Sequence, residues 1–336
     1  MLNANGRKNY TASGNAQAEE LIDSVLAEMA DALKPTGLSI YLGGSYGRGE
    51  GGVRQDTGNG LLYNDLDFFV FARKVNDNAE KLLHDIAEKY EARLKVDVDF
   101  SRPAGTGEIK RNQKRLMMQE LKRGCRLVCG EDLLAEYLPE LPADQLPFSE
   151  ACRLLLNRGM GLHFAQEKIS ANSDETDFIL RNINKAVLGT ADAQLIAQGK
   201  YRWCIAERLA EIQNSDLPGR WKKLYADAVE FKRSPHRNIP EDLPGLLQNV
   251  QDFFQAGVLA VSKADCVENI RQGLWEQCRK AGELNGLNYI RYCVKTRKLH
   301  SDITFLKMPP VAVVLSKLCT KNADSDELYN EWLKFN

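Results

Sequence analysis

The chain has 336 residues, of which 43% are hydrophobic and 27% are charged. These fractions are typical of folded proteins and exclude a chain that is disordered throughout. Lys plus Arg is 45 and Asp plus Glu is 46, so the net charge is only -1; a protein that coats a long polyanion is usually strongly basic, and long nucleic acid is disfavoured as a partner. At about 150 residues per domain, the length predicts two domains.

The sequence shows no pattern typical of export or of a structural metal. Its first fifteen residues, MLNANGRKNYTASGN, lack the apolar core of a signal peptide, and no segment approaches 18 uninterrupted apolar residues. The eight cysteines form no CxxC pair and the four histidines lie far apart, which disfavours a zinc site. We therefore expect a cytoplasmic protein with reduced thiols and no membrane partner. The sequence leaves the oligomeric state open.

The first half of the chain alternates between helical and strand patterns. Residues 1–15 are expected to form a loose tail, and apolar side chains at helical spacing predict a helix over 16–33. Pro35 and Gly37 end that helix. Further along, the patterns predict a loop over 51–63, helices over 77–93 and 108–123, and strands over 38–42, 64–72, 94–100 and 126–130.

The hydrophobic pattern changes after the proline-rich stretch 138–147, which is typical of a linker. From residue 149 onward the periodicity is helical almost throughout, over 150–169, 177–198, 202–213, 220–232, 245–262, 266–281, 284–297 and 310–320. We therefore predict an α+β chain. A small mixed β-sheet domain with flanking helices spans 1–146, and an all-helical domain spans 147–336.

Acidic residues recur at a spacing of two in two of the predicted strands. Asp65 and Asp67 begin the strand over 64–72, and Asp97 and Asp99 lie in the strand over 94–100. Side chains two residues apart on a strand project from the same face, so neighbouring strands could gather these carboxylates. Such a cluster repels itself unless cations occupy it, and all-oxygen ligands favour Mg²⁺ or Mn²⁺.

A glycine-rich turn precedes the acidic pairs. Gly43 and Gly44 follow the strand over 38–42 and let the backbone approach an anion closely. Ser45 adds a hydroxyl donor. Arg48 is a candidate phosphate ligand, with pairing to Glu50 or another acid as the alternative. The turn and the acids together predict a site that holds a triphosphate beside two metal ions.

The order Gly43-Gly44-Ser45, Asp65-Leu66-Asp67 and then an acidic-apolar strand resembles the nucleotidyltransferases of the DNA polymerase β superfamily. The run GGSYGRGE is especially similar to their bacterial minimal and antibiotic-type members. The resemblance covers about residues 16–135. It implies that Asp65 and Asp67 bind the metals, that Gly44 and Ser45 bind the triphosphate, and that Asp97 or Asp99 is the third acid.

The resemblance implies an enzyme that moves a nucleoside monophosphate from an NTP, with ATP as the first expectation, to an acceptor hydroxyl with release of pyrophosphate. Two Mg²⁺ or Mn²⁺ ions are the expected cofactors, and the helical domain contributes to the nucleotide or acceptor pocket. Lys185 is a candidate for contact with the triphosphate from that domain. The acceptor stays open among a small molecule, a protein side chain, an RNA end and a second nucleotide.

Two other functions compete with this one. The chain could be a non-catalytic module that binds nucleotide or a partner protein, or a synthase of a nucleotide second messenger. Residues 47–52 also fit the GxGxxG pattern of dinucleotide-binding proteins. That pattern requires a helix directly after the glycines, and the sequence that follows them is a poor helix former.

Overall fold

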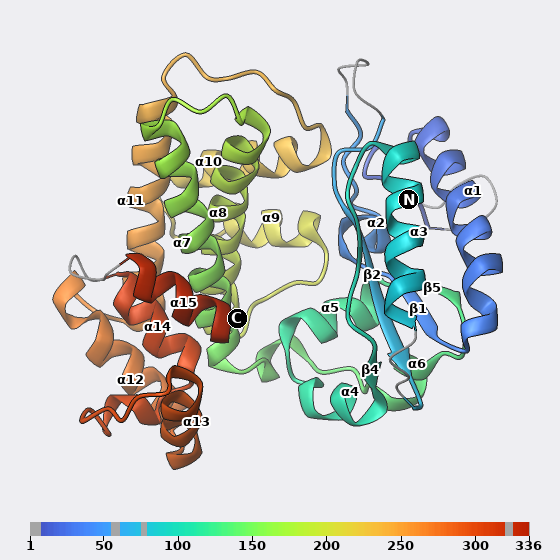
Figure 1. Cartoon of the computed structure of the whole chain (residues 1–336). Helices are drawn as coiled ribbons and strands as arrows, with labels where there is room; N and C mark the ends of the chain where they lie inside the picture. Colours follow the sequence, from blue (N-terminus) through green and yellow to red (C-terminus); the bar gives the residue numbers. More distant parts are fainter. Residues whose placement is uncertain (1–7, 55–60, 75–78, 320–324, 336) are drawn as a thin grey trace. The chain divides into compact units, whose positions relative to one another are not determined.

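The computed structural model (Figure 1) describes residues 8–54, 61–74, 79–319 and 325–335. Within these ranges the chain is 65% helical, with 15 α-helices and a small mixed sheet of five strands, so the predicted α+β class is confirmed. The chain forms two compact units. One contains the chain up to Leu141 together with Val229–His236, and the other contains Pro142–Ala228 and the chain from Arg237 onward.

The first unit contains all five strands. They are β1 (Ser39–Leu42), β2 (Leu66–Ala72), β3 (Val98–Phe100), β4 (Ala104–Gly105) and β5 (Arg126–Cys129). Its helices are α1 (Ala16–Leu33), α2 (Gly44–Arg48), α3 (Ala79–Leu94), α4 (Thr106–Asn112), α5 (Leu116–Gly124) and α6 (Leu133–Tyr137), with a 3₁₀ turn η1 (Lys34–Thr36). Asn15 caps α1 by accepting a hydrogen bond from the Ala18 amide, as its side chain favours at a helix start.

The strands lie in the order β3-β2-β1-β5, and β4 also pairs with β2. β1 is antiparallel to both β2 and β5, whereas β2 runs parallel to β3 and β4. The register between β2 and β3 places Leu66 opposite Val98 and Asp67 opposite Asp99. β2 is therefore central, with the end of β1 and the start of β3 on either side of its first residues.

Alternate residues of β1 and β2 pack into two separate cores. Ile40, Leu42, Leu66 and Phe68 belong to one core with side chains of α1 and α3, so these two helices cover one face of the sheet (Figure 1). Tyr41 and residues of α4, α5 and α6 form the core on the other face. This alternation is the period of two that a strand imposes.

Three differences from the sequence prediction concern this unit. The segment predicted as one helix over 108–123 is two helices, α4 and α5, because Arg115 is extended (φ -71°, ψ 140°). The strand predicted over 94–100 is only β3, because α3 continues to Leu94 and Lys95 is left-handed (φ 60°). Part of the expected loose tail is instead packed: Thr11 is buried, and its amide and hydroxyl both donate to Glu19.

The second unit is helical. Its helices are α7 (Phe148–Ser170), α8 (Thr176–Ala197), α9 (Ile205–Gln213), α10 (Gly219–Arg233), α11 (Leu243–Ser262), α12 (Ile270–Lys280), α13 (Gly286–Thr296), α14 (Pro310–Leu318) and α15 (Ser325–Phe335). Short 3₁₀ turns are η2 (Ala143–Gln145), η3 (Val267–Asn269) and η4 (Phe305–Lys307). α7 and α8 pack along each other as a helical hairpin, α11 packs on both, and α14 packs on α7.

One segment crosses the division that the sequence suggested. The last residues of α10 and those after it, 229–236, belong to the first unit, whereas the sequence analysis placed them in the helical domain. Lys232 contacts Glu50 (2.7 Å), and the Phe231 ring packs edge-on against Tyr63. None of the helices in the described ranges is both long and apolar enough to cross a membrane.

Candidate functional site

The four predicted acids lie at the β2–β3 edge of the sheet in the first unit. Asp67 and Asp99 are register partners, and the Leu66 amide donates to the Asp97 carbonyl (2.9 Å). Leu66 and Val98 belong to the core under α1 and α3, so the acids that alternate with them project from the opposite face. The structure thus brings together on one face the carboxylates that the sequence placed thirty residues apart.

The glycine turn lies directly beside this group. It connects β1 to α2, and the Gly43 amide donates to the Asp67 carbonyl (2.8 Å). Gly44 has a left-handed backbone (φ 57°), and a Cβ built on it would lie 1.9 Å from Asp67 Oδ2. The turn therefore packs against the Asp67 carboxylate only because residue 44 has no side chain. Ser45, the next residue, is half-buried at the same place.

The surroundings of Asp99 change the protonation of its carboxyl. Burial and the nearby charges of Asp65, Asp97 and Glu91 raise the pKa of the Asp99 carboxyl. Burial contributes most to this shift and repulsion by the three neighbouring acids adds to it, so a cation bound beside Asp99 would favour its ionised form. Of the other predicted acids, Asp65 and Asp97 contribute to this shift, together with Glu91 of α3.

The donor set is all oxygen, which suits Mg²⁺ or Mn²⁺ better than zinc. Asp65 and Asp67 are half-buried, whereas Asp97 and Asp99 are exposed. Within the described ranges, no three His, Cys, Asp or Glu side chains are already arranged as a metal site. The carboxylates therefore match the chemistry of a hard cation without forming a ready-made cage for it.

Two other predicted residues have different surroundings. Arg48 lies between two acids, Glu50 (3.5 Å) and Glu120 (3.4 Å), which corresponds to the pairing alternative of the sequence analysis. Lys185 lies in the second unit, exposed on α8. The group in the first unit thus consists of the turn, the four acids and the paired Arg48.

Sequence reasoning missed two residues that organise this region. The Tyr46 hydroxyl is buried; it donates to the Gly52 carbonyl (2.9 Å) and accepts from the Tyr63 and Asn64 amides. It therefore ties the turn to the residue before Asp65. Glu91 on α3 accepts from the Val98 amide (3.1 Å), which fixes the start of β3. No sequence motif marks either residue, because each acts through a hydrogen bond between its side chain and a backbone group in a loop or strand.

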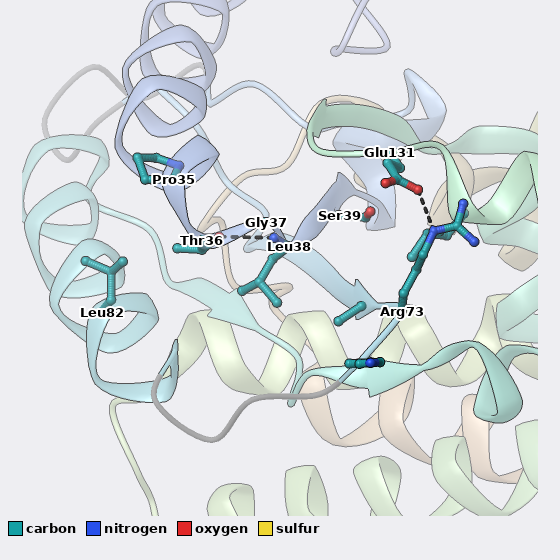
Figure 2. Close-up of a pocket in the computed structure, with 11 residues that line it drawn as sticks. Pro35, Thr36, Gly37, Leu38, Ser39, Arg73, Leu82 and Glu131 are labelled. Carbon is teal, nitrogen blue, oxygen red and sulfur yellow. Dashed lines mark hydrogen bonds and ion pairs between the residues drawn. The ribbon is translucent and has the colours of Figure 1, made fainter.

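A separate cavity of about 510 Å³ lies at the other end of the sheet, where β1 begins and β2 ends (Figure 2). Leu38, Thr36 and Leu82 line it. Arg73 points toward Glu131 there and contacts that carboxylate (2.7 Å) as well as Glu136 (2.7 Å). The positive charge of Arg73 is therefore already matched, and the cavity is distinct from the acidic group.

Comparison with protein-family models, curated proteins and solved structures gave no match to this chain.

Proposed function

We propose that this chain is a metal-dependent nucleotidyltransferase that transfers a nucleoside monophosphate from an NTP, with ATP as the first candidate, to an acceptor hydroxyl. The observation that supports this most is the position of Asp67. Its strand places it opposite Asp99, and its carboxylate lies against the Gly44 backbone. A phosphate-binding turn and paired acids on adjoining strands are the two parts that this chemistry requires.

Asp65, Asp67 and Asp99 are the residues that would hold Mg²⁺ or Mn²⁺. When bound, such ions neutralise the charge of a triphosphate and of the leaving pyrophosphate. Asp99 is assigned as the third acid in preference to Asp97 because it is the register partner of Asp67 and responds to the charge of Asp65. Its raised pKa also suits it to accept the proton of the acceptor hydroxyl.

The turn would position the triphosphate. Gly43 and Gly44 keep the backbone free of side-chain bulk, and Ser45 offers a hydroxyl to a phosphate oxygen. Holding the reacting groups in place and neutralising their charge is most of what phosphoryl-type transfer asks of a protein. All the residues with these proposed roles lie in the first unit. The acceptor remains to be identified.

The test is turnover with each labelled NTP in the presence of Mg²⁺ or Mn²⁺, with and without cell extract. We expect pyrophosphate release that falls at least about a hundredfold in the double variant Asp65→Asn/Asp67→Asn. Asp31→Asn, which alters an exposed acid on α1, is the matched control and should keep full activity. Thermal unfolding of each variant shows whether the fold is preserved.

Mass spectrometry of the products separates the remaining functions. A nucleotide mass on a protein, an RNA end or a small molecule names the acceptor, and soluble oligonucleotides identify a second-messenger synthase. Nucleotide binding without turnover would identify a non-catalytic module. Undiminished pyrophosphate release by the double variant would refute the assignment of these acids.

A further inference from the structure

A groove in the second unit is lined mainly by aromatic and acidic side chains. It has a volume of about 440 Å³ and lies between α7 and α15. Phe164 of α7 and Tyr329 and Trp332 of α15 form its aromatic part. The three ring centroids lie 5.7–5.9 Å from one another, with interplanar angles of 41–75°. The three ring planes are therefore inclined to one another, and none of the three pairs is stacked.

Two carboxylates complete the lining. Glu167 lies one helical turn beyond His163 on α7, with its Oε1 3.3 Å from His163 Nε2, and its side chain is 59% exposed. Asp326 contributes the second carboxylate from the first turn of α15. The described lining includes no Lys or Arg side chain. The groove therefore combines aromatic rings, whose faces carry partial negative charge, with acidic side chains, and none of its described lining residues carries a permanent positive charge.

The aromatic rings are not the only contacts that attach α15. Leu328 and Glu331 are buried, and Glu331 accepts hydrogen bonds from Tyr292 (2.7 Å) and Lys317 (2.7 Å). Tyr329 lies on a different side of the helix and is 42% exposed. The Trp332 indole donates to Asn157 (2.9 Å), which fixes its ring plane. Tyr329 therefore leaves aromatic surface open beside the groove, where a bound group could cover it.

We propose that this groove binds a methylated ammonium group. Such a cation is attracted to the faces of aromatic rings, and its poorly hydrated methyl groups lose little when water is displaced. Glu167 and Asp326 add an attraction of longer range that is weakened by salt. This inference is independent of the proposed nucleotidyl transfer, since none of its residues belongs to the first unit.

The experiment uses the full chain and two probes of the same shape. Choline carries the charge, and 3,3-dimethylbutan-1-ol is its neutral isostere. Isothermal titration calorimetry gives the affinities, and the Trp332 indole resonance, assigned with Trp332→Phe, shows whether the ligand enters the groove. We expect choline to bind at least about tenfold more tightly than the isostere. A peptide carrying trimethyllysine tests whether the ammonium group is presented by a free small molecule or by a protein side chain.

Variants separate the contributions of the Tyr329 ring, its hydroxyl and the Glu167 charge to choline binding. Tyr329→Leu should weaken choline binding about fivefold or more, whereas Tyr329→Phe should retain it because the ring is kept. Glu167→Gln should weaken binding about threefold at low salt, while Glu207→Gln, an exposed acid on α9, should leave it unchanged. Equal affinity for choline and its isostere, or binding of neither choline nor the trimethyllysine peptide, would overturn the proposal.

Discussion

The pKa of the Asp99 carboxyl depends on the residues around it. Asp99 is exposed, yet partial burial and the charges of Asp65, Asp97 and Glu91 raise its pKa. Because the folded chain binds this proton more tightly than the unfolded chain does, ionisation of Asp99 opposes folding. The penalty is absent below the unfolded pKa and is fully present once the pH has risen through the folded pKa.

The variant Asp99→Asn should therefore raise the melting temperature by about 1–2 °C at pH 7 and leave it unchanged near pH 3. Millimolar Mg²⁺ should stabilise the wild type and should stabilise the variant less, since ligand binding to the folded state adds to its stability. Differential scanning calorimetry across this pH range measures both effects. Asp85→Asn, an exposed acid of α3, is the control, and an equal shift in that variant would contradict the argument.

At the scale of elements, the short connection from β1 to α2 determines how closely the turn approaches β2. Gly44 and Gly37 both have left-handed backbones, with φ of 57° and 68°. They differ in their surroundings. A Cβ at residue 37 would have no atom within 4 Å, whereas a Cβ at residue 44 would meet the Asp67 carboxylate at 1.9 Å. The pair separates the cost of the backbone conformation from the cost of the contact.

Gly37→Ala should lower the free energy of unfolding by about 1 kcal/mol, the cost of the left-handed backbone alone. Gly44→Ala should lower it by roughly 3 kcal/mol, because Asp67 must also move. Urea unfolding measures both changes, and Mg²⁺ titration should show weaker binding only in Gly44→Ala. Similar losses in the two variants would show that the turn does not press on Asp67.

Many of these helices and strands could be predicted from the sequence, because hydrophobic periodicity and the glycine and proline residues that end an element are local features. The strand over 38–42 and the helix over 16–33 match β1 and α1 closely. The same reasoning could place Asp65 and Asp67 on one face. It could not find the register that sets Asp67 opposite Asp99, because that depends on pairing between segments about thirty residues apart, nor the role of Glu91, because a side-chain bond to a backbone amide leaves no sequence pattern.

At the scale of the whole chain, the first unit depends on residues that come long after it. Lys232 reaches Glu50 from 182 positions away, and Arg48 shares the same carboxylate. Glu50 is only 8% exposed, so these two cations contribute strongly to balancing its charge. The return segment 229–236 is thus part of the structure that supports the residues after the glycine turn.

Removing this charge should weaken the first unit. We expect Glu50→Gln to lower its free energy of unfolding by about 2 kcal/mol, because two cations lose their shared partner in a largely dry setting. Hydrogen exchange measured by mass spectrometry should then show faster exchange over 229–236. Glu20→Gln, an exposed acid of α1, should change neither quantity. Wild-type protection of 229–236 in Glu50→Gln would show that the ion pair is dispensable.

The alignment of β2 with β3 has a consequence for how this chain can change over time. A shift of β3 by one position would place Asp99 in the hydrophobic core beneath α1 and α3 and would expose Val98 to solvent. The penalty for such a slip is set by the core and not by catalysis. A change that shifts β3 by one position should therefore destabilise the first unit, whether or not the acids take part in catalysis.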